Sequence, residues 1–271
     1  MPHSLVINFT TTSDIPLGYT SGKHLHALFL NLVNSVDQEL AEYFHQSSTH
    51  KTFTISPLQV NYNHKKTDNL LQWQHQSKIK AGSNCWWRIT LLDDNLFGKL
   101  TKLWINLRPD KPYHLGSGEL LITSVLCSPD SHPWANACSY QRIYEEASET
   151  ERNFTFNIVT PTSFRRGKYD LFLPTTELVF NSLLKRWQKH SNTLIDLTNF
   201  DNLFPAYFNI NTEIVIQPQT KFIGCVGKIT YKVLGDVEPS IIKQLNVLAD
   251  YAFYCGLGRK TTMGFGTVTR Q

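Results

Sequence analysis

Near the end of the chain stands the stretch Tyr254-Cys255-Gly256-Leu257-Gly258-Arg259-Lys260-Thr261-Thr262-Met263-Gly264-Phe265-Gly266. Its last eleven residues, 256–266, hold four glycines with a basic pair and two threonines between them, and we call them the glycine loop. A backbone so rich in glycine can approach another group closely, and its N–H groups and basic side chains suit phosphate. We interpret the loop as an element that binds a polyanion. The alternative is a tight turn that joins a helix to a final strand at 265–270.

An amphipathic helix precedes the glycine loop. Apolar residues recur at helical spacing over 241–252, after Glu238-Pro239 and before Gly256. The loop therefore follows a helix, whereas nucleotide-binding loops of the P-loop or dinucleotide kind precede one and use the positive end of its dipole. This position argues against a nucleoside triphosphate and for a longer polyanion such as RNA, held by Arg259, Lys260 and the loop amides.

The rest of the chain shows one order of elements twice. In the first half we expect strands at 4–10, 53–60, 86–92 and 119–126, and helices at 25–40 and 96–107. In the second half we expect strands at 153–160, 208–217, 222–234 and 265–270, helices at 175–190 and 239–254, and a short helix at 140–147 before them. Two β-α-β-β-α-β runs predict an α+β protein of two tandem ferredoxin-like domains, 1–128 and 151–271, joined by a linker at 129–150.

Composition and charge narrow the class of protein. Hydrophobic residues make up 41% and charged residues 18% of the 271 positions, which is typical of a folded globular chain. The net charge of +4 permits binding of nucleic acid without demanding it. The chain shows neither a long apolar run nor a signal peptide, so we expect a cytoplasmic protein with no membrane partner. Its five cysteines are scattered without a C-x-x-C pair and are interpreted as reduced thiols.

Other kinds of catalytic chemistry lack their motifs in this sequence. There is no His-Glu-x-x-His, no Gly-x-Ser-x-Gly and no Walker sequence. The carboxylate pair Asp93-Asp94 opens a predicted helix, where an aspartate serves as an N-cap, so we do not interpret the pair as a metal site. We expect neither a metal nor a cofactor.

The motifs together resemble a known family. Beside the glycine loop, the segment 160–167 reads Thr-Pro-Thr-Ser-Phe-Arg-Arg-Gly and follows a predicted strand. Further matches are Leu25-His26-Ala27-Leu28-Phe29-Leu30, Ser56-Pro57-Leu58, Arg88-Ile89-Thr90-Leu91-Leu92 and His132-Pro133-Trp134. From end to end the chain resembles the CRISPR-associated endoribonucleases of the repeat-associated (RAMP) superfamily, which cut repeat RNA into guide RNAs.

The resemblance implies a metal-independent cleavage. In this family a ribose 2′-hydroxyl attacks the adjacent phosphate and leaves a 2′,3′-cyclic phosphate and a 5′-hydroxyl, which requires a base, an acid and a cation. The sequence offers His24 and His26, which lie about 200° apart on a helix, so geometry does not choose between them. The family's histidine directly precedes the Ala-Leu-Phe-Leu run, which selects His26 and keeps His24 in reserve. Tyr19 and Lys51 are the candidates for positioning and charge stabilisation.

The resemblance also implies RNA-binding residues. We expect them in the glycine loop, in the basic run after the predicted strand at 153–160, and beside the two histidines. They are Lys23, Arg165, Arg166, Lys168, Gly256, Gly258, Arg259, Lys260, Thr261, Gly264 and Gly266. The basic residues Lys185, Arg186, Lys189 and His190 are interpreted instead as favourable charges at a helix C-terminus.

The expected partner is CRISPR repeat RNA, with or without a stem-loop, and by resemblance a Cascade-like guide-RNA complex. The sequence leaves the oligomeric state open. The alternative function is a non-catalytic RNA-binding RAMP subunit of such a complex, and a more distant one is a cellular protein built from two RNA-recognition modules.

Overall fold

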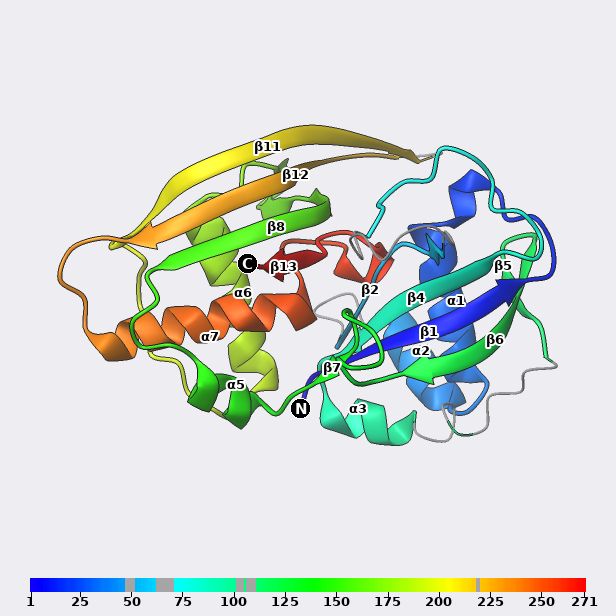
Figure 1. Cartoon of the computed structure of the whole chain (residues 1–271), viewed down its shortest axis with the longest axis horizontal. Coiled ribbons are helices and arrows are strands. Elements are labelled where there is room, and N and C mark those ends of the chain that lie inside the picture. The colour runs from blue at the N-terminus through cyan, green and yellow to red at the C-terminus, as the bar shows by residue number, and fades with distance from the viewer. Residues whose placement is uncertain (47–51, 62–70, 101–104, 106–110, 218–219) are drawn as a thin grey trace. The chain divides into compact units, whose positions relative to one another are not determined.

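The computed structural model describes residues 1–46, 52–61, 71–100, 105, 111–217 and 220–271. It divides into two compact units, each with its own sheet and helices (Figure 1). The first unit comprises Met1–Ala137 together with Thr262–Gly264, and the second comprises Cys138–Thr261 together with Phe265–Gln271. The predicted α+β class is confirmed. Among the described residues, no helix is both long enough and apolar enough to cross a membrane.

The first unit is built on an antiparallel sheet in the order β2-β4-β1-β6-β5. These strands are β1 (His3–Thr11), β2 (Phe53–Ile55), β4 (Asn84–Leu91), β5 (Tyr113–Leu115) and β6 (Gly118–Leu126). Two short strands, β3 (Gln59–Val60) and β7 (Asn136–Ala137), pair with β4 and β1. The helical segments are η1 (Leu17–Tyr19), α1 (Lys23–Asn34), α2 (Gln38–Gln46) and α3 (Asp94–Lys99). Helices α1 and α2 cover one face of the sheet (Figure 1).

Alternation along β1 explains why the helices lie on that face. Leu5, Ile7 and Phe9 point to one side of the strand and join the buried face of α1, which contributes Leu25, Leu28, Phe29, Leu32 and Val33. The predicted helix at 25–40 is in fact two helices. The Asp37 carboxylate accepts the N–H of Leu40 at 2.8 Å and so begins a new helix after the first has ended at Asn34.

The predicted strand at 53–60 is likewise interrupted. Pro57 has no N–H to donate to a sheet, and Leu58 donates its N–H to the Thr20 carbonyl at 2.9 Å instead of to β4. The predicted helix at 96–107 begins as α3, capped by Asp93, whose side chain accepts the N–H of Asn95 at 2.9 Å. Most of its remainder, 101–104 and 106–107, lies outside the described residues.

The second unit has a four-stranded antiparallel sheet in the order β11-β12-β8-β13. These strands are β8 (Asn153–Thr162), β11 (Leu203–Gln217), β12 (Thr220–Val233) and β13 (Val268–Arg270). The helices are α5 (Tyr140–Glu146), α6 (Thr176–His190) and α7 (Pro239–Cys255), and a separate hairpin joins β9 (Phe164–Arg166) to β10 (Tyr169–Leu171). The order β8, α6, β11, β12, α7, β13 along the chain is the β-α-β-β-α-β run of a ferredoxin-like domain.

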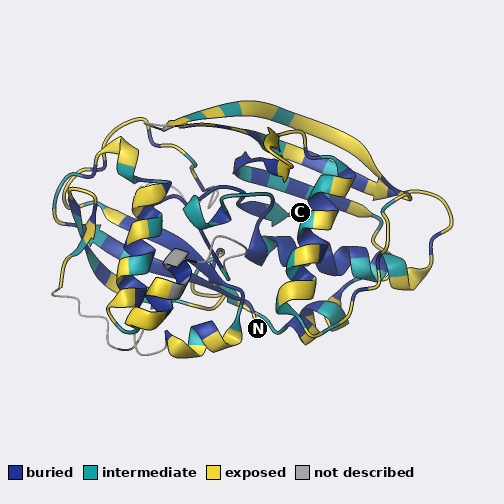
Figure 2. Cartoon of the chain, turned by 180° about the vertical axis from the view of Figure 1, so that it is seen from behind, coloured by how far each residue is buried: buried dark blue, intermediate teal, exposed yellow. Residues whose placement is uncertain are grey.

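The core of the second unit is largely aromatic. Phe156, Phe180 and Tyr231 are fully buried, and the Phe180 ring meets the Tyr231 ring edge-on with centroids 5.4 Å apart. The edge strand β11 is by contrast mostly exposed (Figure 2). It begins at Leu203 rather than at 208, because Leu203 through Pro205 already pair with the end of β12.

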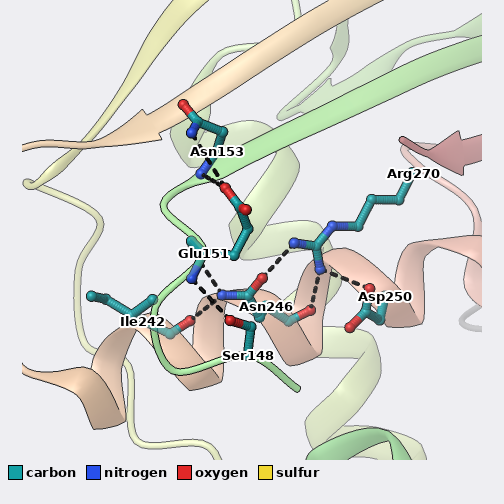
Figure 3. Close-up of polar contacts among 7 residues, drawn as sticks. All are labelled: Ser148, Glu151, Asn153, Ile242, Asn246, Asp250 and Arg270. Atoms are coloured by element: carbon teal, nitrogen blue, oxygen red, sulfur yellow. Dashed lines mark hydrogen bonds and ion pairs between the residues drawn. The ribbon is translucent and has the colours of Figure 1, made fainter. Parts of the chain in front are cut away.

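A polar network fixes the helix that leads into the glycine loop (Figure 3). The fully buried Asn246 of α7 donates to the carbonyls of Glu151 and Ile242, each at 2.9 Å, and accepts from Arg270 of β13. Arg270 also pairs with Asp250 of the same helix at 2.7 Å. Burial raises the pKa of the Asp250 carboxyl, and the Arg270 charge opposes this rise. The network thus joins α7 to β13 and to the segment before β8.

We expect Asn246→Ala to lower the free energy of unfolding by about 2–3 kcal/mol, because the hydrogen bonds that the fully buried Asn246 makes with the Glu151 carbonyl and with Arg270 would be lost. Urea denaturation measures this loss. The matched control is Asn181→Ala, on the exposed face of α6, which should change the value by less than about 0.5 kcal/mol. Equal effects of the two substitutions would contradict the importance of the network.

Candidate functional site

The ring of His26 is held by a backbone carbonyl. It lies in the first turn of α1, half-buried, with Nδ1 2.8 Å from the carbonyl oxygen of Thr262. A carbonyl oxygen only accepts hydrogen bonds, so Nδ1 carries the proton and Nε2 of the neutral ring is the nitrogen that accepts one. The ring also stacks on Phe53 of β2, with centroids 5.6 Å apart and planes inclined by 21°. Its orientation and its tautomer are therefore both fixed.

Backbone contacts hold the two segments that meet at His26. Gly22, directly before α1, has a φ of 73° and donates its N–H to the Met263 carbonyl at 2.9 Å. On the other side, a Cβ added at Gly264 would lie 3.3 Å from the Pro57 nitrogen. Residues Thr262–Gly264 thus pack within the first unit, between the start of α1 and the segment after β2.

His24 occupies a different environment from His26. Its exposed ring meets the half-buried Tyr19 ring edge-on, with centroids 4.2 Å apart. Partial burial lowers the pKa of His24, which favours the neutral form at pH 7. Tyr19 in turn covers Gly116, where an added Cβ would lie 2.5 Å from its ring. Tyr19 and His24 form one pair, and the ring of His26 packs elsewhere.

Two other residues predicted for this region are less informative. Lys23 is exposed at the first position of α1. Lys51 lies outside the described residues. For both, a role in RNA binding or charge stabilisation stays a prediction.

The glycines of the loop are explained by close backbone approaches within the protein. An added Cβ would lie 2.2 Å from the Ser163 carbonyl oxygen at Gly258, 2.7 Å from the Gly266 oxygen at Gly256, and 2.0 Å from the Leu257 oxygen at Gly266. All three residues have a positive φ. Two loop amides also have backbone partners, since Leu257 N–H donates to the Gly266 carbonyl at 2.8 Å and Arg259 N–H donates to the Ser163 carbonyl, outside the loop, at 2.9 Å. These two amides therefore already have partners within the protein.

Three residues of the loop's basic tip are partly exposed: Gly258, Arg259 and Lys260. Lys260 has a φ of 58°, unusual for a residue with a side chain, and its ammonium lies 5.1 Å from the centre of the Phe222 ring. Thr261 and Gly264, both predicted to bind RNA, are buried. Binding by any loop residue stays a prediction.

The predicted basic run forms a hairpin that the sequence analysis missed. Arg165 and Arg166 end β9, Gly167 turns the chain with a φ of 60°, and Lys168 leads into β10. All four residues are exposed. A glycine between two short polar and aromatic runs is a hairpin signal, which could have revealed this element.

Two residues of the second unit that were not predicted as site residues contact the glycine loop. Asp170 of β10 pairs with Arg165 at 3.0 Å and also with Arg259 of the glycine loop. Arg186, interpreted from the sequence as a charge at the end of its own helix, donates to the carbonyls of Cys255 and Gly258. Apart from the Asp170–Arg165 pair within the hairpin, these contacts join residues 69 to 89 positions apart, and no local sequence pattern predicts them.

The described residues contain no group of three or more His, Cys, Asp or Glu side chains that could hold a metal ion. The predicted N-cap role of Asp93 is confirmed. Its neighbour Asp94 bonds with the buried His3 at 2.9 Å, and this bond lowers the pKa of Asp94. The Asp93-Asp94 pair therefore has structural partners.

Comparison with known proteins covers nearly the whole chain. Residues 1–145 match the family model for the CRISPR Cas6 N-terminal domain, and residues 156–268 match that for the CRISPR-associated endoribonuclease Cas6. A CRISPR-associated endoribonuclease Cas6 of Streptococcus thermophilus is 23% identical over 252 residues, which are 88% of this chain and 87% of that protein.

Two solved structures are also similar to this chain. The structure of a Cas6 product complex superposes with a TM-score of 0.81 and 26% identity, covering 100% of this chain and 99% of that one. Thermus thermophilus Cas6 superposes with a TM-score of 0.74 and 24% identity, covering 100% of this chain and 98% of that one. The similarity to Thermus thermophilus Cas6 is one of fold.

Proposed function

Since the chain belongs to the Cas6 family of CRISPR-associated endoribonucleases, we propose that it cuts CRISPR repeat RNA by attack of a ribose 2′-hydroxyl on the adjacent phosphate. The resemblance drawn from its sequence motifs is confirmed, and with it the assignment as an RNA endonuclease. In the proposed reaction the 2′-oxygen bonds to phosphorus and the bond to the 5′-oxygen breaks. The products are a 2′,3′-cyclic phosphate and a 5′-hydroxyl.

The hydrogen bond between His26 Nδ1 and the Thr262 carbonyl is the observation that carries this proposal. With Nδ1–H donating to the Thr262 carbonyl, Nε2 is the atom that accepts the proton of the 2′-hydroxyl. The same carbonyl stabilises the imidazolium that forms, because it accepts a hydrogen bond from a positively charged ring. We therefore assign His26 as the general base. His24 stays the reserve, since its lowered pKa also suits a base.

The remaining groups are proposed by role. Tyr19, whose ring packs on His24, is a candidate to position the reacting ribose or phosphate, and Lys51 to stabilise its charge. Arg165, Arg166, Lys168, Arg259 and Lys260 supply positive charge in the second unit, and we propose that they contact the RNA backbone. Such contacts would also retain the cut RNA and favour association with a Cascade-like guide-RNA complex.

The test is cleavage of a labelled repeat RNA with and without EDTA. Because the proposed chemistry uses only side chains and the 2′-hydroxyl, we expect the same rate in both conditions and one cut with a cyclic phosphate end. A matched RNA with a 2′-deoxy sugar before the cut should stay intact. Binding without any cut would contradict the proposal and favour a non-catalytic RNA-binding subunit. Loss of cleavage in EDTA, restored by Mg²⁺, would contradict metal independence.

A further inference from the structure

One carboxylate oxygen of the second unit holds two arginines from different segments. Oδ1 of Asp170 lies 3.0 Å from Nη1 of Arg165 across the β9–β10 hairpin, and it also accepts from Nη1 of Arg259 in the glycine loop. The side chains of Asp170 and Arg259 are 33% and 29% exposed, so the pair is partly shielded from water. Arg165 is more open, at 51%. The carboxylate of Asp170 therefore connects the β9–β10 hairpin to the glycine loop at Arg259.

The backbone around this carboxylate is fixed from several directions. Arg186 donates to the carbonyls of Cys255 and Gly258, directly before Arg259. The N–H of Arg259 donates to Ser163, directly before β9. Within the hairpin, Nε of Arg165 donates to the Gly167 carbonyl at 3.1 Å. The side chains of Arg165 and Arg259 thus extend from a rigid backbone, and Asp170 is the group that sets their direction.

Electrostatics favour an ionised Asp170. Burial raises the pKa of its carboxyl, but the hydrogen bonds and positive charges of Arg259 and Arg165 together outweigh this effect and hold the pKa below its usual value. The three charges sum to +1, and each guanidinium uses only its Nη1 on the carboxylate. Five N–H donors in a planar fork leave each arginine able to bond a phosphate while keeping its place.

We propose that Asp170 is a positioning residue for RNA recognition, which holds Arg165 and Arg259 together as one prealigned phosphate-binding pair. The inference rests on the proposed function, because it concerns how repeat RNA is held. It assigns to a negative charge a favourable role in binding a polyanion. The negative charge of Asp170 by itself should repel RNA, whereas its alignment of the two arginines should favour RNA binding. Because these two effects on affinity have opposite signs, a variant that removes the charge separates them.

The experiment compares Asp170→Asn with the wild type in binding to repeat RNA and to a scrambled RNA of the same length and composition. If the alignment of the arginines dominates, affinity for the repeat should fall about fivefold, while affinity for scrambled RNA stays equal or rises up to about twofold. Equal or tighter binding of both RNAs by the variant would overturn the inference. A wild type without preference for the repeat would instead overturn the proposed function.

The control for charge is Glu149→Gln. It removes one negative charge from another ion pair of the same unit, in which Glu149 lies 2.9 Å from Lys243. We expect no loss of repeat affinity from this change, and a loss equal to that of Asp170→Asn would overturn the inference.

Two further variants show whether Asp170 acts through the arginines. In the background Arg165→Ala with Arg259→Ala, adding Asp170→Asn should cause no additional loss of repeat affinity, and an undiminished fivefold loss would overturn the inference. Asp170→Glu keeps the charge but displaces it by one methylene, so it should lower repeat affinity about twofold. This variant also carries the test if Asp170→Asn shows a lower thermal unfolding midpoint.

Discussion

Replacing His26 with alanine is expected to slow single-turnover cleavage of repeat RNA about a thousandfold, because a general base contributes roughly 10² to 10⁴ in rate. The dissociation constant for the RNA should change less than about threefold, since one neutral ring contributes little to backbone binding. Quenched-flow cleavage and filter binding on the same preparation separate the two effects. The ring is half-buried against Phe53, so thermal unfolding should be measured alongside.

His24→Ala is the matched control for this experiment. It removes the same kind of side chain two residues earlier on the same helix. The ring of His24 is exposed and packs on Tyr19. We expect it to slow cleavage about tenfold or less, through loss of contact with Tyr19. If His24→Ala slows cleavage more than His26→Ala does, His24 is the general base instead. Undiminished cleavage by both variants would contradict the assignment of either histidine.

The second large effect is expected at Gly258. An alanine there would be held at a φ of 68° with its Cβ 2.2 Å from the Ser163 carbonyl oxygen, so the backbone must move. We expect a free energy of unfolding lower by about 3 kcal/mol and an affinity for repeat RNA lower by more than about tenfold. The affinity falls because the displaced loop loses the hydrogen bond from Arg259 N–H to Ser163 and carries the Arg259 side chain with it. Urea denaturation and filter binding measure the two quantities.

Gly235→Ala is the control that separates the cost of a positive φ from the cost of a steric clash of the added Cβ. Gly235 has a similar φ, 77°, but no atom lies within 4 Å of an added Cβ. This substitution should cost about 1 kcal/mol of stability and leave RNA affinity unchanged. If both variants lose the same stability, the contact with Ser163 tolerates a methyl group and our explanation of Gly258 is wrong.

Local patterns predicted most of the fold. Alternation along β8 and helical spacing along α6 and α7 gave these elements within two residues of their observed ends. Elements were missed where a single side chain overrides the pattern, as Asp37 does when it divides the first predicted helix. The β9–β10 hairpin was missed for another reason: it is three residues long on each side, too short for periodicity to show.

The candidate site was less predictable than the fold. The motif selected His26, but a sequence does not show which ring nitrogen carries the proton, because that depends on Thr262, 236 positions away. The glycine loop was interpreted as a surface that approaches phosphate. Its glycines are explained by approaches to Ser163 and to the loop's own carbonyls, which only the folded chain displays. Asp170 went unnoticed because a lone acidic residue after a basic run has no pattern.

The bond between His26 and Thr262 has a consequence for how the protein is made. At the usual speed of about 5–20 residues per second, the ribosome needs on the order of tens of seconds to pass from one residue to the other. For most of that interval His26, the proposed general base, has left the ribosome without the carbonyl that orients its ring. Nascent protein should therefore leave repeat transcripts uncut. For the same reason, a gene fragment that encodes only 1–137 would yield a first unit without Thr262–Gly264, and co-expression of the missing half would be needed to restore cutting.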